Sequence, residues 1–394
     1  MCKIYTDNKT NKAQIVLGSL LGDEGKGITT DYLCKKNPFG TIVVRFSGGH
    51  QAGHNVKIGK VSHVHSNLGS GTLRGVPSYF SEHCTFYPVT LENELRVILP
   101  KMNGCHPKFY YHPLAQLTTP ADVAYNRWRE QKLGHGSCGL GVGATMKRNA
   151  ETPYKVYAID LLNTEALLQK CKSITNYYID LIGKDNPEIE DFYDLYNPEF
   201  PKFNEVIKSM NYIVRDYDYL KSFENIIFEG SQGILLDMDH GFFPNVTYGN
   251  TTSKNALEIC KKLDITDIEI FYVTRCYQTR HGAGWMSNEA KIDLTNTQDE
   301  INSYNVWQKN FRIGEIDYNL LNYAYTIDSI YSKNITKNLV VTCMDQRPGF
   351  EFEYNKLEFC FKNIYESYSS DSKTFIQVAS NEKYIPGYRR ESEH

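Results

Sequence analysis

The sequence predicts an α/β fold with a mostly parallel central sheet and flanking helices. A short β-branched apolar run at 13–17 leads into a glycine-rich turn, and a stretch that suits a helix follows at 28–36. Similar short apolar runs recur along the chain, each followed by polar or glycine-rich residues. Hydrophobic residues make up 41% of the chain and charged residues 23%, which is typical of a globular protein.

The elements follow one another in the order that a parallel sheet requires. The runs at 13–17 and 41–46 (TIVVRF) flank the helix at 28–36, which makes a strand–turn–helix–strand unit. Further strands are expected at 225–228, 268–274, 338–342 and 374–379. Residues 151–224 suit a helical insertion, so we expect one large domain over 1–394. Open parallel sheets bind ligands at the carboxyl ends of their strands, so the loops there are the candidate functional segments.

Composition excludes several classes of function. A net charge of -3 gives no reason to expect binding to nucleic acid or to a membrane surface. The ten cysteines include no CxxC pair, which indicates reduced thiols rather than a metal finger. The first residues, MCKIYTDNKTNK, lack the apolar core of a signal peptide, and no stretch approaches a membrane span. We therefore expect a soluble cytoplasmic protein, or one of the host cytoplasm if the source is viral.

The turn after the first strand, GDEGKG at 22–27, is glycine-rich but is not a Walker loop. A Walker loop would need Gly at position 20 and Ser or Thr at position 27, where this chain has Leu20 and Gly27. Backbone amides at the helix start, together with Lys26, could still bind a phosphate. A phosphate would repel Asp23, so this residue is expected to bind Mg²⁺, to act as a general base, or both. The alternative is a turn whose acid caps the following helix.

Two more glycine-rich segments follow predicted strands. The first, SGGHQAGHN at 47–55, contains His50 and His54, and its three glycines favour a loop. A histidine in such a loop can donate a proton or a hydrogen bond to a reacting oxygen; the alternative is a structural role. The second, FEGSQGILLDMDHGFFPNVTYGNTT at 228–252, has amides and hydroxyls at a density that suits a base and a phosphate. The spacing of Asp237 and Asp239 disfavours an EF-hand Ca²⁺ loop.

Together and in this order, the three segments resemble the adenylosuccinate synthetase family. That family has GDEGKG after its first strand, VVRFxGGxxAGH after its second and FEGxQGxLLDxDHGxxPxVTxxNTT later; here these are 22–27, 43–54 and 228–252. The resemblance continues through TRHGAG at 279–284 and loosely covers most of the chain. It implies a P-loop-like nucleotide fold and a ligase that joins L-aspartate to carbon 6 of a 6-oxopurine nucleotide. A nucleoside triphosphate would first phosphorylate O6, and the aspartate amine would then displace that phosphate.

The resemblance also implies roles for individual residues. Asp23 would take the purine N1 proton and bind Mg²⁺ together with the carbonyl of Gly53, His54 would stabilise charge on O6, and Lys26 would hold phosphate oxygens. Contacts to the nucleoside triphosphate are implied for Gly22, Glu24, Gly25, Gly27, Arg312, Asp345 and Ser380. Contacts to the purine monophosphate are implied for Gln51, Ser137, Cys138, Gln232, Leu236, Thr247 and Arg148. Arg148 is the candidate for the arginine that one subunit of a homodimer extends into its neighbour.

The aspartate site departs from the family pattern. The arginine-rich loop that binds the aspartate carboxylates corresponds to 306–314, where only Arg312 clearly remains, with Lys309 nearby. Arg280 or Arg275 is therefore expected to help bind aspartate.

The nucleotide sites depart as well. The family's guanine-reading Lys-Leu-Asp is CMD at 343–345 here, and ASN at 379–381 replaces a Ser-Thr-Gly element. GTP is the expected triphosphate, with ATP or dATP as the alternative. These departures resemble a branch with viral members, some of which act on dGMP. Members of that branch often have Ser or Gly at the position of Asp23, so its retention here favours IMP, with dGMP as the alternative.

The sequence disfavours two other classes of protein. A nucleotide-binding regulator that has lost catalysis is disfavoured because Asp23, Lys26 and His54 are all present. A different α/β NTPase is disfavoured by the absent Walker loop and by the segment at 228–252.

Overall fold

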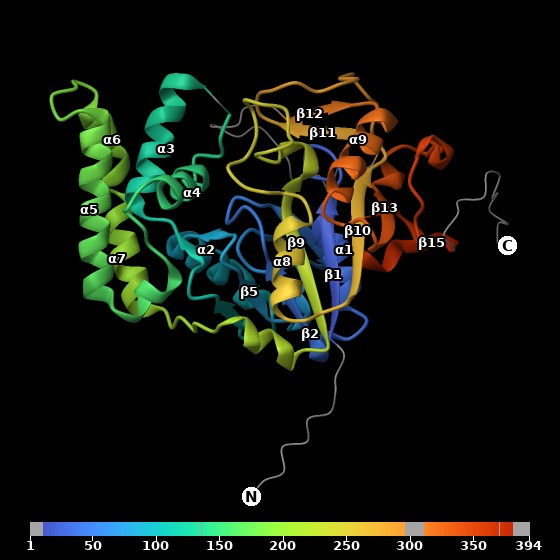
Figure 1. Cartoon of the computed structure of the whole chain (residues 1–394), viewed down its shortest axis with the longest axis horizontal. Helices are drawn as coiled ribbons and strands as arrows, with labels where there is room; N and C mark the ends of the chain where they lie inside the picture. Colours follow the sequence, from blue (N-terminus) through green and yellow to red (C-terminus); the bar gives the residue numbers. More distant parts are fainter. Residues whose placement is uncertain (1–10, 135, 296–310, 370, 381–394) are drawn as a thin grey trace, which may run out of the picture.

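Nine strands form one central sheet in the computed structural model, which describes residues 11–134, 136–295, 311–369 and 371–380. Their order is β15-β14-β13-β10-β1-β9-β2-β5-β7, and every neighbouring pair is parallel except β14 with β15. The predicted α/β fold with a mostly parallel sheet is therefore confirmed (Figure 1). The strands of this sheet are β1 (Lys12–Gly18), β2 (Thr41–Arg45), β5 (Ser78–Phe80), β7 (Phe109–Tyr111), β9 (Asn225–Gly233), β10 (Asp267–Arg275), β13 (Thr336–Thr342), β14 (Asn363–Ser367) and β15 (Phe375–Ser380).

Three smaller sheets and a set of helices complete the described chain. The small sheets pair β3 (His54–Ile58) with β4 (Val61–His65), β6 (Thr85–Phe86) with β8 (Gln116–Leu117), and β11 (Gln278–His281) with β12 (Phe311–Gly314). The α-helices are α1 (Lys26–Cys34), α2 (Pro88–Ile98), α3 (Pro120–Leu133), α4 (Val142–Glu151), α5 (Thr164–Ile182), α6 (Ile189–Tyr196), α7 (Glu199–Ser209), α8 (Lys254–Lys262) and α9 (Tyr318–Ser329). Within the described residues, no helix combines the length and the apolar character that crossing a membrane requires.

All six strands predicted from apolar runs are present, and the reason is burial. All five residues of β2 are buried, as are the last six of β1, because helices cover a parallel sheet on both faces. β15 differs in direction. It runs antiparallel to β14, and Ser380 pairs with Asn363, the first residue of β14. The carboxyl end of β15 therefore lies toward the amino ends of the parallel strands, which does not support the predicted contact of Ser380 with the triphosphate.

Three hydrophobic clusters lie in the described chain, and two of them contain most of its buried apolar residues. The larger one surrounds the central strands and includes Ile15, Phe228 and Tyr272. The second lies among α2, α3, α5, α6 and α7, with Leu91 and Phe192 fully buried in it. The helices predicted within 151–224 are α5, α6 and α7, and the earlier helix α3 packs against all three. These helices lie at one end of the molecule, opposite β13 and β15 (Figure 1); the domain boundaries stay a prediction.

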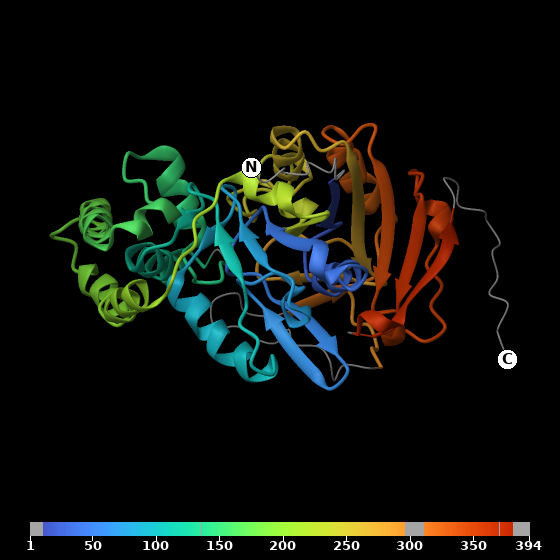
Figure 2. The ribbon, with the colours of Figure 1, turned by 90° about the horizontal axis from the view of Figure 1, so that it is seen from below.

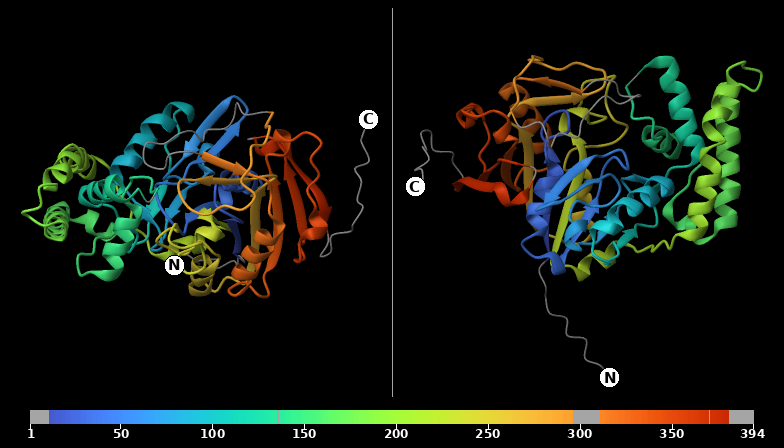
Figure 3. Two further views of the ribbon diagram at one scale, coloured as in Figure 1. Left: turned by 90° about the horizontal axis from the view of Figure 1, so that it is seen from above. Right: turned by 180° about the vertical axis from the view of Figure 1, so that it is seen from behind.

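The hairpin of β3 and β4 stands beside α2. Figure 2 shows the hairpin projecting from the sheet with α2 along its flank, and Figure 3 shows the same two elements together from behind. β3 also packs on α1. The hairpin thus lies between two parts of the structure. On one side is α1, which follows the glycine-rich turn at 22–27, and on the other is α2, which belongs to the second hydrophobic cluster.

Candidate active site

The three glycine-rich segments meet at the carboxyl edge of the central strands. The turn at 22–27 follows β1, the loop at 46–53 follows β2, and β9, which lies between these strands, continues into the third segment. The backbone amide of Leu235 donates to the carbonyl of Leu20 at 2.9 Å, and the hydroxyl of Ser231 donates to the carbonyl of Ser47 at 2.6 Å. Segments far apart in the sequence therefore form one site, where a parallel sheet is expected to bind ligands.

The turn at 22–27 requires glycine at position 25. Gly25 precedes α1 with φ +96°, and a Cβ there would lie 2.8 Å from the side chain of Thr342 at the end of β13. The hydroxyl of Thr342 donates to the carbonyl of Glu24 at 2.8 Å, which joins the turn to β13. No side chain caps α1, so the alternative in which Asp23 caps the helix is not supported. The carboxylate of Asp23 instead lies at the site with its side chain 25% exposed, 3.8 Å from Nε2 of His281.

The two other charged residues of the turn point inward. Glu24 is buried, and its carboxylate accepts a hydrogen bond from the amide of Leu20. Burial raises the pKa of Glu24 to about 7, although the nearby charge of Lys26 opposes the rise. Burial also lowers the pKa of Lys26, which is 2% exposed. The turn therefore offers a desolvated ammonium group to an arriving phosphate, whereas the carboxylate of Glu24 supports the turn from within.

His54 is oriented by a buried carboxylate. Its Nδ1 lies 2.7 Å from Oε1 of Glu229, which belongs to β9 and is fully buried. Ser70 donates both its amide, at 3.0 Å, and its hydroxyl to the same carboxylate. Burial alone would raise the pKa of Glu229, but His54, the charge of Arg45 and the Ser70 hydroxyl lower it to about 2. Glu229 is therefore ionised at neutral pH and accepts the Nδ1 proton of His54.

This arrangement leaves the other nitrogen of His54 available. Nε2 is buried and makes no hydrogen bond in the described chain, and burial lowers the pKa of the ring. A close approach between Gly27 and His54 keeps the ring beside the turn, since a Cβ on Gly27 would lie 2.6 Å from the Cβ of His54. The sequence motifs contain Glu229 but give it no role. Its place directly after the strand expected at 225–228 indicates a site residue, whereas nothing in the sequence singles out Ser70.

Two predicted monophosphate contacts, Gln51 and Gln232, flank the backbone of Gly48. A Cβ on Gly48 would lie 3.0 Å from Nε2 of Gln51 and 2.7 Å from Oε1 of Gln232. The side-chain oxygen of each glutamine is buried without a hydrogen-bond partner in the described chain. Such orphaned acceptors are expected where a ligand supplies the donors. Leu236 and Thr247 are also brought together, because the amide of Thr247 donates to the carbonyl of Leu236 at 2.9 Å.

The loop with Ser137 and Cys138 contacts the segment at 47–55, because Leu140 meets His50. Two backbone amides of this loop already donate to a carboxylate. Both Gly136 and Ser137 donate their backbone amides to Glu130 of α3. A monophosphate bound here would have to displace that carboxylate. Burial raises the pKa of Cys138 to about 11, which keeps its thiol neutral. Nε2 of the buried His50 contacts the carbonyl of Leu140 at 2.9 Å, which supports the structural alternative for that histidine.

Arg148 does not extend toward another subunit. The side chain is 1% exposed, and its guanidinium donates to both carboxylate oxygens of Asp122, at 2.8 and 2.9 Å. It also donates to Asn149 and to the carbonyl of Tyr154. A guanidinium with these partners inside its own subunit cannot reach a neighbour's ligand, so this prediction is wrong.

The two arginines predicted to bind aspartate, Arg280 and Arg312, differ in the exposure and the hydrogen-bond partners of their side chains. Arg280, 2% exposed, donates to the carbonyls of Ala283, Trp285 and Asn245 at 2.9–3.1 Å. It holds a turn together, and the prediction that it binds aspartate is not supported. The side chain of Arg312 is 23% exposed; it pairs with Glu289 and donates to carbonyls of the same turn. Residues 306–310, including Lys309, lie outside the described residues.

The last predicted triphosphate contact, Asp345, follows β13 directly. It lies in the 3₁₀-helix Met344–Gln346, three residues after the Thr342 that contacts the turn. This position is at the same sheet edge as Lys26 and His54. A base-reading role for Asp345 stays a prediction.

Comparison with known proteins identifies the family of this chain. The family model for adenylosuccinate synthetase matches residues 15–393. The chain is 32% identical over 294 residues to the adenylosuccinate synthetase of Coxiella burnetii (strain CbuG_Q212), covering 72% of this chain and 65% of the relative. It is 30% identical over 345 residues to that of Buchnera aphidicola subsp. Schizaphis graminum (strain Sg), covering 82% and 76%. The match thus spans just under two thirds of the Coxiella relative.

Two solved structures share the fold. A fully ligated adenylosuccinate synthetase from Plasmodium falciparum superposes with a TM-score of 0.66 at 19% identity, covering 94% of this chain and 88% of that chain. The succinoaminodeoxyadenylate synthetase of cyanophage S-2L, bound to dGMP and to dATP as an energy donor, gives a TM-score of 0.63 at 15% identity, covering 93% and 95%. From the family match over residues 15–393 and the relatives at 30–32% identity, we conclude that this chain belongs to the adenylosuccinate synthetase family.

Proposed function

We propose that this protein is a purine-biosynthetic ligase that converts IMP, L-aspartate and GTP into adenylosuccinate, GDP and phosphate. The observation that carries the proposal is the pairing of His54 with Glu229 beside Lys26 and Asp23. It gives one edge of the sheet a buried imidazole nitrogen, a desolvated cation and a carboxylate. Those are the groups that phosphorylation of a purine oxygen requires.

The proposed chemistry proceeds in two steps. Asp23 takes the N1 proton of the purine, so O6 becomes nucleophilic and attacks the γ-phosphorus, and the nucleoside diphosphate leaves. Lys26 and the amides of Gly25 and Gly27 neutralise the transferring phosphoryl group. The aspartate amine then attacks carbon 6 and releases one proton to solvent, the C–O bond breaks and phosphate leaves. Nε2 of His54 donates to O6 once it has taken a proton from solvent, and Glu229 balances the imidazolium that results.

The donor set of the turn fits Mg²⁺. The carboxylate of Asp23 is partly exposed and the backbone of Gly53 is exposed, so each can offer an oxygen, and oxygen ligands are those that Mg²⁺ prefers. Mg²⁺ would supply charge neutralisation of the triphosphate. The carboxylate of Glu24 is unsuited to this role because it is buried and bonded to Leu20.

The choice of nucleotides rests on two carboxylates. Asp23 is retained in the turn, which favours IMP over dGMP, and Asp345 can accept hydrogen bonds from guanine N1 and N2, which favours GTP over ATP or dATP. We also propose that Arg312 binds an aspartate carboxylate and that the protein is a homodimer, as in the family. Arg148 takes no part in that dimer, because it is buried against Asp122.

One assay tests the proposal and its alternatives. Phosphate release is measured with IMP or dGMP, each combined with GTP, ATP or dATP, in the presence and absence of L-aspartate. The proposal expects the fastest aspartate-dependent release with IMP and GTP. Release that requires dGMP would reassign the monophosphate, and triphosphate hydrolysis indifferent to aspartate and purine would contradict the ligase altogether. A protein that binds nucleotides without any turnover would be a regulator.

A further inference from the structure

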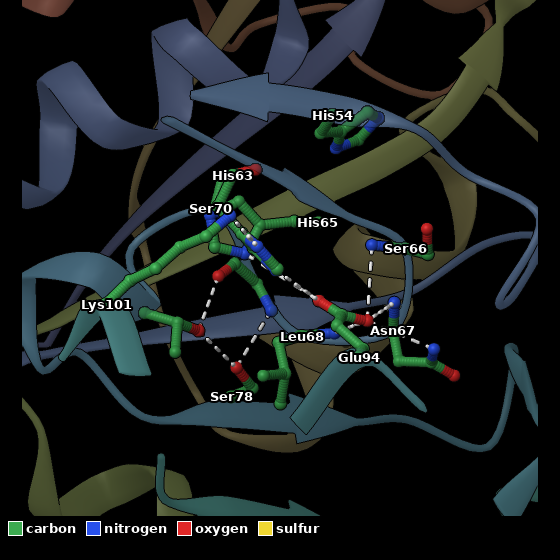
Figure 4. A network of polar contacts seen from close by, with 12 residues as sticks. His54, His63, His65, Ser66, Asn67, Leu68, Ser70, Ser78, Glu94 and Lys101 are labelled. Carbon is green, nitrogen blue, oxygen red and sulfur yellow. Dashed lines mark hydrogen bonds and ion pairs between the residues drawn. The ribbon is translucent and has the colours of Figure 1, made fainter. Parts of the chain in front are cut away.

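A second group of metal-ligating side chains lies beside the strand that carries His54, between the β3–β4 hairpin and α2. His63 and His65 belong to β4, and Glu94 belongs to α2. One ligand atom from each lies within 4.8 Å of the others. Nε2 of His63 is 3.4 Å and Nδ1 of His65 is 3.9 Å from Oε1 of Glu94. All three residues are buried, and Figure 4 shows them gathered beneath the strand that carries His54.

The carboxylate of Glu94 is held with one oxygen facing the histidines. Its Oε2 accepts the backbone amide of Asn67 at 2.6 Å and the Asn67 side chain at 3.1 Å, with the amides of Ser66 and Leu68 at 3.3 and 3.4 Å. These donors fix the carboxylate independently of the histidines. Oε1 is left to face two imidazole rings, which is how outer contacts orient a carboxylate that binds a metal.

His65 has no hydrogen-bond partner within the described chain. The residue is 0% exposed, and neither ring nitrogen donates or accepts a hydrogen bond. An unsatisfied buried polar group costs about 1–3 kcal/mol, so its presence calls for a partner.

Two of the separations between ligand atoms are close to those around a tetrahedral ion. Zn²⁺ binds imidazole nitrogen and carboxylate oxygen at about 2.0–2.2 Å, which places two ligands of a tetrahedron roughly 3.4 Å apart. The separation of 3.4 Å between His63 and Glu94 has this value, and that of 3.9 Å for His65 requires only a small side-chain shift. Two imidazoles among three ligands favour Zn²⁺ or a similar first-row ion over Mg²⁺.

We propose that His63, His65 and Glu94 bind one Zn²⁺ or similar first-row divalent ion, which fastens β4 to α2. His65 pairs with His54 across the hairpin, so the ion would also steady the strand on which His54 lies. One change accompanies binding. Nζ of Lys101 lies 3.4 Å from Nδ1 of His63, and this ammonium must turn away, because His63 bound through Nε2 carries a proton on Nδ1.

The test compares His65→Phe with the wild-type full-length chain. Both proteins are stripped with a chelator, and Zn²⁺ binding is measured by competition with a chromophoric chelator in excess Mg²⁺. Mg²⁺ occupies oxygen sites and leaves imidazole sites open. The wild type is expected to bind one Zn²⁺ with sub-micromolar affinity and to melt at a higher temperature with Zn²⁺ than without. Phenylalanine fills the space of a ring that makes no hydrogen bonds, so His65→Phe is expected to fold.

The variant is expected to weaken Zn²⁺ binding by more than the roughly 10- to 100-fold that loss of an outer contact causes, and to lose the rise in Tm. The matched control is His106→Ala, which removes an exposed histidine and should leave binding unchanged. The proposal would be overturned if His65→Phe bound Zn²⁺ as tightly as the wild type, or if the wild type bound no Zn²⁺. Loss of Zn²⁺ binding in His106→Ala would overturn it as well. The Co²⁺ complex of the wild type gives an independent measurement: an intense tetrahedral visible spectrum supports the site, and a weak octahedral spectrum contradicts it.

Discussion

Replacing Glu229 by glutamine tests whether a buried carboxylate prepares His54 for catalysis. In the native protein this carboxylate accepts from Nδ1 of His54 and from two donors of Ser70. Glutamine has nearly the same shape, but it carries no charge and presents an NH₂ group to at least one of these donors. The imidazole then loses the charge that balances its protonated form, while Asp23 and Lys26 are untouched.

The expected loss follows from the strength of one charged hydrogen bond. Hydrogen bonds to charged groups contribute about 1.5–3 kcal/mol, and each 1.36 kcal/mol is a factor of ten in rate, so kcat should fall roughly 10- to 160-fold. KM for the nucleotides should change little, because Glu229 is fully buried behind His54.

The stability of the same variant gives a second expectation. The pKa of Glu229 is lowered from 4.5 to about 2, which corresponds to about 3 kcal/mol of unfolding free energy. Because the folded-state pKa is lowered, this contribution is complete above pH 4.5 and is lost as the pH falls toward 2. The variant should therefore lose less stability than the wild type over that interval.

Steady-state kinetics and urea unfolding at several pH values measure these effects. Glu205→Gln, at an exposed position of α7, is the matched control and should behave as the wild type. A folded Glu229→Gln protein with unchanged kcat would refute the role assigned to the pair.

Three further substitutions separate binding, aspartate recognition and stability. Asp23→Ala should retain triphosphate binding, measured by titration, while losing most turnover; unchanged turnover would remove Asp23 from the chemistry. Arg312→Ala should raise KM for aspartate roughly 10- to 160-fold, by loss of one charged contact, and an unchanged KM would exclude it from that site. Arg148→Ala should lower the unfolding free energy by about 3–5 kcal/mol, because it leaves Asp122 buried and unpaired. A loss within the error of urea unfolding would contradict that ion pair.

Much of the fold could be predicted from the sequence, because strands buried on both faces are continuous apolar runs. Strand direction could not. The run at 374–379 resembles the others, yet β15 is antiparallel, and its direction depends on pairing with the edge strand β14. The hairpin of β3 and β4 was also missed, because its two strands are short and about half of their residues are polar.

The sequence predicts those site residues that lie within short local motifs. Asp23, Lys26 and His54 lie in short glycine-rich segments, and the parallel sheet brings those segments together. Contacts between distant segments were not predictable. A sequence does not indicate whether an arginine faces solvent or a buried acid, so Arg148 was misassigned although its partner Asp122 lies only 26 positions earlier.

The central claim is that O6 of the purine is phosphorylated before the aspartate amine displaces it. Monophosphate labelled with oxygen-18 at the 6-oxo position tests this claim directly, with the released phosphate analysed by mass spectrometry. If O6 attacks the γ-phosphorus and later leaves with it, each released phosphate carries the label. Unlabelled phosphate, formed while aspartate is joined to carbon 6, would contradict the account.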